Sequence, residues 1–563
     1  SLSGANFTLG LWDIVAVRTS HVEFVTGGNF RIRQLDGVTN FLSDPHSTQV
    51  AGTMIASGIN TNAKGMSFSS YLLSHDWNND YAEMALAATS NDLRISNHSY
   101  GRNTGWNMVN LTGTWNWVWW GDPYVNLYED YKFGFYSTNE SRLIDQTVFE
   151  ASTYLPVWAS GNERGGINWG PASQPIFHWL YINGSFYSTT SLVHYSDGGQ
   201  YGYDLIPSQG AAKNVLTVGA VSNVLGGYTS PTNVSLAYFS SVGPTDDGRI
   251  KPDVVANGVN LYTTYNSSNA AYSTASGTSF SAPSVAGSLN LLQQLYGESR
   301  GTNRALLAST IKGIAIHTAD DCGTAGPDYT FGWGLVNTPA AALLITNDLS
   351  GDGHTHIKEV AMPNGETISF PVLATNTRPL KVTICWTDPP GPMLSPSLNP
   401  TNLVLINDLD LRIIGPSGTT NLPWMLNPAS PSSTATTGDN FRDNVEQVYI
   451  AAPTNGIYTV KVTHKGALSN DWQDVSILIS GNLPMDKPEL EIIDVDRYFA
   501  PTNTLEWPSV VGQFYRVQSN TNLIDGMWID NTGDISALRT NIVVGVGTNP
   551  EPDVFFFRIN EVP

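Results

Sequence analysis

Two stretches of the chain place a reactive side chain where a helix is predicted to begin. Ser279 lies in SGTSFSAPSVAG, directly before an apolar helical pattern, and Pro283 follows four residues later. The free N–H groups and partial positive charge at a helix start can stabilise an oxyanion. His46 precedes a second helical pattern, where an imidazole is available as a general base. The pair suggests a serine nucleophile activated by a histidine, although an ordinary helix cap explains either residue when taken alone.

Two further polar residues follow apolar runs. Asp13 comes directly after LGLW, and Asn162 follows LPVWASG. A carboxylate bonded to a histidine fixes its tautomer and stabilises the imidazolium that forms during reaction. A neutral amide can donate a hydrogen bond to a developing oxyanion. Taken alone, Asp13 is also a strand-end cap and Asn162 a turn residue, so the functional interpretation requires the four residues to meet in space.

Strands and helices alternate along the first part of the chain. The candidate strands are Leu9–Trp12, Ser69–Leu73, Leu93–Ser96, Leu155–Ala159 and Val215–Val221. Helical patterns include His46–Ser57 and the segment after Ser279, whose apolar face is Ala282, Val285, Leu289, Leu292 and Tyr296, with Gly297 as the expected stop. This order predicts an α/β fold with a parallel sheet flanked by helices. In such sheets, ligands bind at the carboxyl ends of the strands.

The pattern changes after residue 345. Runs such as LKVTICWTD, NDLDLRII and GIYTVKVTH alternate with turn residues, which predicts a β-sandwich or jelly-roll domain over residues 346–482. The linker GNLPMDKP follows, and residues 489–563 are predicted to form a small all-β module. Residues 1–345 are the predicted catalytic domain.

Composition excludes several classes of protein. The 563 residues carry a net charge of -21, which argues against nucleic acid or an anionic membrane as partner. No apolar run approaches the roughly 20 residues of a membrane span. The chain opens at Ser1 without methionine, as expected of a processed, secreted form. Cys322 and Cys385 are interpreted as isolated buried thiols rather than a disulfide.

Five segments, in this order, carry a resemblance to a known family: HSTQVAGT, ASGN, YFSSVGPTDDGRIKPDVVANG, GTSFSAP and DYTFGWGLVN. Together with Asp13, they resemble motifs of the subtilisin-like serine proteases (subtilases) over about residues 9–340. The resemblance implies a triad of Asp13, His46 and Ser279, with Asn162 in the oxyanion hole. It implies a secreted serine endopeptidase that acts on protein and peptide substrates, and we expect a monomer.

The resemblance also implies where a substrate would lie. Ser99, Tyr100 and Gly101 would pair with an extended substrate strand. The primary pocket would lie between them and the segment formed by Ala159, Ser160 and Gly161. Its small walls, with no acid to select lysine or arginine, predict cleavage after large apolar residues.

Several residues depart from the family pattern. Ile14 and Val15 follow Asp13 where the family has Ser/Thr-Gly, and Ser47 replaces a glycine after His46. These changes leave open a catalytically silent binding or adhesion protein on the same scaffold; an acid peptidase with a Glu/Asp/Ser set is disfavoured by His46 and Asn162. Phe280 replaces the methionine that commonly follows the nucleophile, and a phenylalanine cannot form a sulfoxide. We therefore expect activity to survive peroxide, as in the oxidatively stable alkaline proteases with a C-terminal β jelly roll, which the chain resembles.

Two other features allow more than one interpretation. Asp388, Asp408 and Asp410 are candidate ligands for a structural calcium ion, which related proteases with this β domain bind. The aromatic-rich segment from Gly105 to Tyr136 is either local packing, which we favour, or an insertion that faces the substrate.

Overall fold

The structure is a computed structural model that describes most of the chain. Its described residues are 2–562, except 112, 127–128, 165–174, 192–201, 301–304, 351–355, 484–490, 497–501, 509–513, 521–528, 531–534, 537–540 and 548–555. Most of the predicted linker at 481–488 therefore lies outside the described residues.

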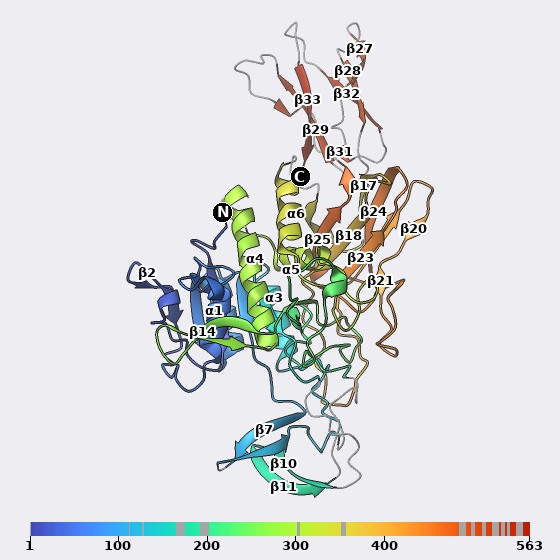
Figure 1. The fold of residues 1–563 in the computed structure, drawn as a ribbon. Coiled ribbons are helices and arrows are strands. Elements are labelled where there is room, and N and C mark those ends of the chain that lie inside the picture. The colour runs from blue at the N-terminus through green and yellow to red at the C-terminus, as the bar shows by residue number, and fades with distance from the viewer. Residues whose placement is uncertain are drawn as a thin grey trace.

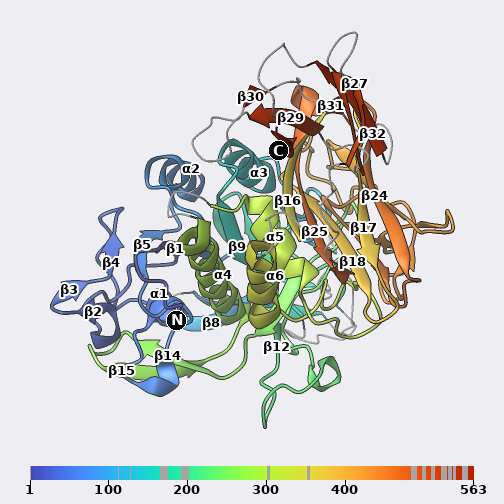
Figure 2. The same ribbon diagram turned by 90° about the horizontal axis from the view of Figure 1, so that it is seen from above.

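A seven-stranded parallel sheet forms the centre of the first part of the chain, which is the blue to green part of Figure 1, and strands of this sheet are labelled in Figure 2. Its strands are β1 (Thr8–Asp13), β4 (Ile32–Gln34), β5 (Tyr71–Asp76), β6 (Ile95–His98), β9 (Leu155–Ala159), β12 (Leu216–Val221) and β13 (Val254–Asn257). They lie in the order β4-β5-β1-β6-β9-β12-β13, and each neighbouring pair is parallel. The predicted α/β class is confirmed, and the direction of winding reverses between β1 and β6.

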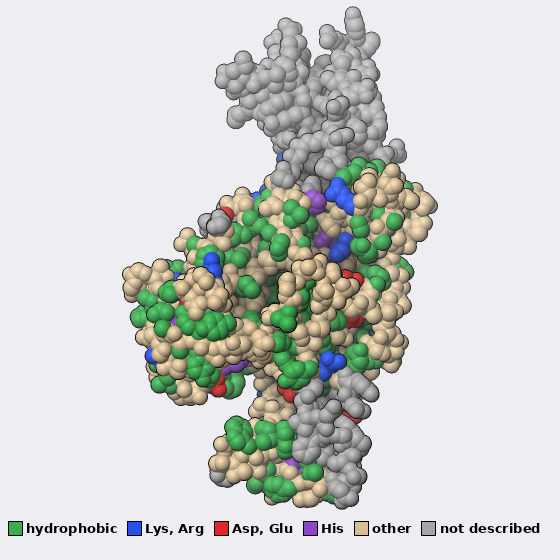
Figure 3. Space-filling view, viewed as in Figure 1, with side chains coloured by type: hydrophobic (Ala, Val, Ile, Leu, Met, Phe, Trp, Pro, Cys, Tyr) green, Lys and Arg blue, Asp and Glu red, His purple; other side chains and the backbone are tan. Residues whose placement is uncertain are grey.

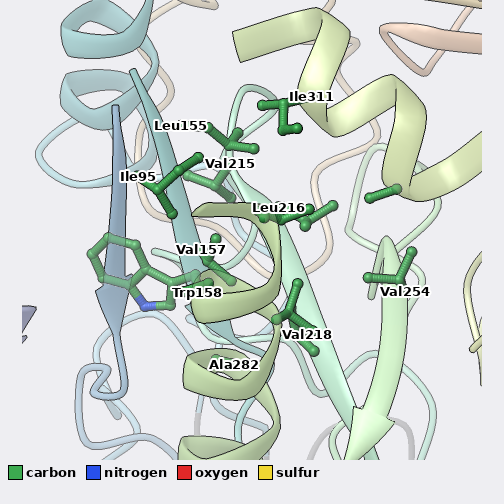
Figure 4. Close-up of a cluster of buried hydrophobic side chains, with 14 of the residues drawn as sticks. Ile95, Leu155, Val157, Trp158, Val215, Leu216, Val218, Val254, Ala282 and Ile311 are labelled. Atoms are coloured by element: carbon green, nitrogen blue, oxygen red, sulfur yellow. The ribbon is translucent and has the colours of Figure 1, made fainter. Parts of the chain in front are cut away.

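Helices cover both faces of this sheet (Figure 2). They are α1 (His46–Ile55), α2 (Asp80–Ser90), α3 (Ser141–Glu150), α4 (Thr278–Arg300), α5 (Ala308–His317) and α6 (Thr338–Ser350). Figure 4 shows Ala282 of α4 among buried side chains that include Val157 of β9 and Val218 of β12, all fully buried. Burial of one such valine contributes about 1.5–3 kcal/mol. The expected stop at Gly297 is wrong: α4 continues through this buried glycine to Arg300, because tertiary packing overrides its weak helix propensity.

A separate four-stranded sheet extends from the body of the molecule (Figure 1). It consists of β7 (Trp106–Leu111), β8 (Thr114–Trp119), β10 (Ile176–Ile182) and β11 (Ser185–Ser191), in the order β11-β10-β8-β7. Trp106 and Trp119 are buried in it, as a packing role requires, whereas Trp115 is 64% and Phe177 57% exposed. Hydrophobic side chains are accordingly visible on the surface of this sheet in Figure 3. The aromatic-rich segment thus supplies both a local core and an exposed aromatic surface.

Two antiparallel sheets pack face to face after residue 356. One contains β16 (Ile357–Pro363), β25 (Trp472–Ser480), β18 (Leu380–Trp386) and β23 (Val445–Ile450); the other contains β20 (Thr420–Asn421), β19 (Asp408–Ile414), β24 (Gly456–Lys465), β17 (Ile368–Ala374) and β26 (Asn482–Leu483). Side chains from both sheets, among them Ile384, Leu411 and Val460, form one buried cluster. This is the arrangement of a β sandwich.

The remaining elements are short or lie near the carboxyl end. The hairpins are β2 (Val25–Thr26) with β3 (Asn29–Phe30), β14 (Leu261–Tyr265) with β15 (Ala271–Ala275), and β21 (Trp424–Met425) with β22 (Thr436–Thr437). The last strands are β27 (Glu491–Asp496), β28 (Thr502–Pro508), β29 (Phe514–Asn520), β30 (Ile529–Asp530), β31 (Ile535–Ser536), β32 (Asn541–Gly547) and β33 (Phe556–Val562), and their described pairings are antiparallel.

The first sandwich sheet is buried on both faces. On β18 and β25, one set of alternating residues faces the second sheet, and the other set faces α5. Cys385 and Leu478 belong to the second set and join the hydrophobic core of the α/β part. Cys385 and Cys322 are both free and buried. The predicted boundary at residue 345 is therefore crossed by a continuous core.

Candidate active site

The sequence-predicted residues gather at the carboxyl edge of the central sheet. Asp13 ends β1, and Ser99 follows β6, the two strands between which the winding reverses. His46 is the first residue of α1, and Ser279 is the second residue of α4. Asn162 lies in the loop after β9. An edge of this kind, at a reversal of strand order, is the usual ligand site of a parallel α/β sheet.

Asp13 and His46 form a short hydrogen-bonded pair. Asp13 Oδ1 accepts from His46 Nδ1 over 2.7 Å, and the Asp13 side chain is 1% exposed. The amide of Ile14 donates to the same oxygen over 2.7 Å. Burial lowers the pKa of His46, but the charge and hydrogen bond of Asp13 outweigh this and raise the pKa above its ordinary value. A neutral His46 that donates from Nδ1 carries its lone pair on Nε2, as a general base requires.

Ser47, one of the departures from the family pattern, contacts the buried carboxylate of the Asp13–His46 pair. Its hydroxyl donates to Asp13 Oδ1 over 3.2 Å and accepts from the amide of Val15 over 3.1 Å. Ser47 is fully buried. Asp13 Oδ2 is also buried and bonds to none of the described residues. The family has a Ser or Thr hydroxyl at the position of Ile14. Here Ser47 of α1 supplies a hydroxyl to Asp13 instead, and only the three-dimensional arrangement reveals this.

Pro283 explains how the start of α4 is joined to the segment after β6. A proline has no N–H, so the carbonyl of Ser279, four residues earlier, has no helical donor. The hydroxyl of Ser99 donates to that carbonyl over 3.0 Å. In return, Ser279 Oγ donates to the carbonyl of Ser99 over 3.3 Å. The proline therefore frees a backbone group that ties the two segments together.

His46 lies beside the helical turn that carries Ser279. Its ring meets the ring of Phe280 edge-on, with centroids 5.8 Å apart. The Ser279 hydroxyl is turned toward Ser99 in this structure, and its long bond there leaves it able to rotate about χ1. In enzymes without substrate, catalytic hydrogen bonds are often long or misaligned and tighten on binding.

Asn162 is exposed and oriented by the start of α4. Its Oδ1 accepts from the amide of Thr278 over 2.9 Å and from the Thr278 hydroxyl over 3.1 Å. Because a backbone N–H can only donate, the amide oxygen must face Thr278, and the Nδ2 donors are directed elsewhere. Gly277, with φ of 151°, precedes this turn in a backbone conformation that favours glycine.

Tyr100 points into the protein between two residues of the predicted substrate segment. Its hydroxyl donates to Asp80 Oδ2 over 2.8 Å and bonds to His98 Nδ1 over 3.0 Å. Its carbonyl accepts from Trp158 Nε1 over 2.8 Å. Burial raises the pKa of Asp80 to about 6. Asp80 lies on α2, and nothing in the sequence pattern indicated its contact with Tyr100.

The second predicted substrate segment, Ala159 to Gly161, is hydrogen-bonded to two other segments of the chain. The Ser160 amide donates to the carbonyl of Val218 over 3.0 Å, and its hydroxyl donates to the carbonyl of Ser241 over 3.2 Å. Ala159 is buried, with 8% of its surface exposed, and Gly161 has a φ of 100°. These contacts place the segment beside the neighbouring strand β12.

The three predicted calcium ligands already have cationic partners. Asp388 Oδ2 accepts from Lys213 Nζ over 2.5 Å, and both residues are fully buried. Asp408 and Asp410 each lie 3.0 Å from Lys465 Nζ. An ammonium group supplies the charge that a calcium ion would otherwise bring, so these carboxylates do not fit one shared calcium site as they are arranged here. Calcium dependence stays a prediction from the resemblance.

A nearby group of carboxylates was not predicted as a set. Asp410, Asp439 and Glu446 each place an oxygen within 4.8 Å of the others. Arg412 lies 2.9 Å from both aspartates, so this group also carries its own counter-charge.

Comparison with known proteins places the chain in a family. The sequence profile described as the subtilase family matches residues 37–334, more than half of the chain; the match includes His46, Asn162 and Ser279, and Asp13 precedes it. C5a peptidase of Streptococcus pyogenes serotype M3 is 41% identical over 85 residues, which is 15% of this chain and 7% of that protein. Pyrolysin of Pyrococcus furiosus is 37% identical over 109 residues, covering 16% of this chain and 8% of that protein. The matches thus span less than a tenth of these two relatives.

Solved structures of lower similarity were also found. The prenylagaramide maturation protease PagA covers 61% of this chain and 94% of its own at 17% identity and a TM-score of 0.38. Within the described part of the chain, no helix has the length and apolar character needed to cross a membrane. With the fold, the site at the sheet edge and the profile match in agreement, the chain belongs to the subtilase family of serine peptidases.

Proposed function

We propose that the chain is a serine endopeptidase in which Asp13, His46 and Ser279 act as a triad. The observation that carries this proposal is the 2.7 Å bond from His46 Nδ1 to buried Asp13, with Ser279 at the start of the adjacent helix. In this scheme His46 Nε2 takes the proton of the Ser279 hydroxyl as the oxygen attacks a peptide carbonyl. His46 then gives the proton to the leaving amine, and water releases the acyl-enzyme.

The oxyanion would be bound by two donors. One is the backbone N–H of Ser279 at the start of α4, and the other is Nδ2 of Asn162. The bonds from Thr278 to the Asn162 oxygen support this role, because they fix the amide so that its NH₂ group is free to donate. Donors held in place before the reaction need no reorganisation when the charge develops.

The substrate would pair with the strand-like segment Ser99–Gly101. Tyr100 bonds inward through both its hydroxyl and its carbonyl. Since successive residues of an extended segment alternate in direction, the backbones of Ser99 and Gly101 face a peptide, which would take the Ser99 carbonyl from its long 3.3 Å bond to Ser279 Oγ. The pocket for P1, the residue whose carbonyl is attacked, would be bounded by Ala159, Ser160 and Gly161. The small walls favour a large apolar P1 side chain and broad tolerance elsewhere.

A fluorophosphonate probe tests the nucleophile directly. We expect the probe to label the wild-type chain and not Ser279→Ala. Ser281→Ala is a matched control, because Ser281 lies in the same helix with its hydroxyl bonded to the carbonyl of Thr278 over 2.9 Å. No labelling of the folded wild type would instead favour the catalytically silent binding protein, and labelling that persists in Ser279→Ala would show that another residue is the nucleophile.

Specificity and location are further parts of the proposal. A peptide library should show P1 preferences for Phe, Tyr, Leu and Met, and a profile dominated by Arg or Lys would contradict the assignment of the pocket. Secretion is proposed from the resemblance, and detection of the native chain in the culture medium of its source would test it.

A further inference from the structure

A pocket lies beyond the end of the proposed substrate segment. It has a volume of about 330 Å³, and its lining includes Arg102, Asn103, Trp120, Asp122, Lys132 and Tyr181. Arg102 and Asn103 directly continue the chain from Gly101. Trp120 follows β8, and Tyr181 lies on β10. The outlying sheet therefore forms one wall of the pocket, and the continuation of the substrate segment forms another.

The pocket is reached by a substrate strand that runs away from the nucleophile. Ser99 is bonded to Ser279, so it marks the end nearest the reacting carbonyl. An extended chain advances about 3.3 Å per residue, so Arg102, three residues further on, lies at most roughly 10 Å away along the segment. A substrate that pairs with this segment would bring its side chains at about P4 to P6 to the pocket.

The lining offers a cationic group that is only partly neutralised. The Arg102 side chain is 61% exposed, and its Nε donates to Glu140. Its two terminal nitrogens have no partner among the described residues. A guanidinium fork of this kind matches a carboxylate in shape and charge. Beside it, Lys132 Nζ donates to the carbonyl of Trp120 over 2.5 Å and lies 3.5 Å from Asp130, so the terminal nitrogens of Arg102 are the more open cationic donors of the described lining.

The aromatic wall suits the methylene stem of a substrate side chain that carries this carboxylate. Trp120 and Tyr181 contact each other with ring centroids 4.5 Å apart. A glutamate that reached Arg102 would lay its methylene groups against these rings. Asp122, the single acid in the lining, accepts from the amide of Tyr124 over 2.8 Å. The lining holds Arg102 and Lys132 against Asp122, and outside it Glu140 and Asp130 each face one of the two cations.

We propose that this pocket is a distal specificity subsite that binds an acidic substrate side chain at P4, P5 or P6 through Arg102. The proposal rests on the proposed function, because it uses the same direction of the substrate. The outlying sheet then has a role in selecting substrates, in addition to packing.

Matched peptides measure the effect. A fluorogenic series with constant P1 to P3 carries Glu, Gln or Lys in turn at P4, P5 and P6. At one of these positions, Glu should give a KM about fivefold lower than Gln, the scale of an ion pair at a partly exposed site, and Lys should give a higher KM. Arg102→Gln should bring the Glu-to-Gln ratio to about one. Arg33→Gln, which changes an exposed arginine on β4, should keep the wild-type ratio.

A binding assay separates this inference from the proposed function. Fluorescence polarisation of the same peptides on Ser279→Ala requires no catalysis and should show the same preference for Glu. Arg102→Gln also removes the bond to Glu140 and could loosen the loop. Arg102→Lys keeps the charge without the fork, so it should recover part of the preference for Glu. Equal KM and equal binding for Glu and Gln at all three positions would overturn the subsite while the labelling of Ser279 still stood. A preference for Lys would overturn it as well.

Discussion

Lys213 is the buried charge that joins the α/β part of the chain to the β sandwich. Its Nζ donates to Asp388 Oδ2 over 2.5 Å, to the carbonyl of Pro389 over 2.6 Å and to that of Val404 over 2.8 Å. Asp145 lies 4.0 Å away, and the side chains of Lys213, Asp145 and Asp388 are all fully buried. We predict that Lys213→Met strongly destabilises the chain.

The magnitude follows from what the substitution leaves behind. Methionine fills a similar volume, so little packing is lost, but Asp388 loses its counter-charge and two carbonyls lose a donor. Removing one partner of a buried ion pair typically costs about 3–5 kcal/mol, a large part of the 5–15 kcal/mol that stabilises a typical protein. Asp388→Asn in the same chain should recover part of the loss, because it removes the stranded charge and keeps an oxygen for the amide of Asn407.

The deficit should also depend on pH. Burial raises the pKa of Asp388, and Lys213 opposes that shift. Without Lys213, the folded-state pKa rises further above the unfolded value, so the folded state binds the extra proton. The free energy of unfolding of Lys213→Met therefore falls as pH rises from the unfolded-state to the folded-state pKa of Asp388. Its difference from the wild type is larger at pH 8 than at pH 5.

Urea unfolding of inactive Ser279→Ala backgrounds, followed by tryptophan fluorescence, measures these differences without self-digestion. Lys64→Met is the matched control: Lys64 is exposed, its Nζ lies 3.6 Å from the centroid of the Phe68 ring, and its loss should cost less than about 1 kcal/mol. If Lys213→Met cost no more than Lys64→Met, the buried pair would not hold the two parts together.

Three substitutions probe the site. Asp13→Asn should lower kcat by about 10⁴-fold and shift the acidic limb of kcat/KM to lower pH, because Asp13 is what raises the pKa of His46 above its ordinary value; an unmoved limb would refute this cause. Ser47→Ala removes a bond to a charged oxygen, worth about 1.5–3 kcal/mol of stability, so the pKa of His46 should rise and the same limb move to higher pH, while kcat falls because Asp13 is held less firmly; a fall in kcat without that movement would indicate a merely structural role. Wild-type activity should survive a peroxide concentration that inactivates Phe280→Met, and equal loss in both would show that oxidation acts elsewhere.

Local patterns were sufficient to predict five of the seven strands of the central sheet and the helices that carry the candidate site, but not the two edge strands β4 and β13. Leu155–Ala159 was predicted with the bounds that the structure gives to β9, and α1 begins at His46 as expected. Short apolar runs and helical periodicity are properties of neighbouring residues, so one sequence reveals them. The end of α4 was missed because a buried glycine in a packed helix looks the same in sequence as a glycine that stops one.

The contacts that connect distant segments could not be predicted in this way. The bond from Ser47 to Asp13 and that from Tyr100 to Asp80 depend on where helices and strands pack, and no spacing rule encodes them. The same holds for Arg102, whose neighbours in the pocket come from segments that lie far apart in the chain.

The α/β part and the β sandwich share a hydrophobic core across the predicted domain boundary near residue 345. Alternation along β18 identifies two sets of side chains, but it cannot show that both are buried. Val382 and Ile384 face the second sheet, whereas Thr383 bonds to His317 of α5 over 2.8 Å and Cys385 enters the core of the α/β part. Because α5 packs on one side against the central sheet and on the other against the sandwich, removing the sandwich would expose an apolar face of the very layer that supports the strands of the site. The sandwich therefore contributes to the stability of the α/β part that carries the site.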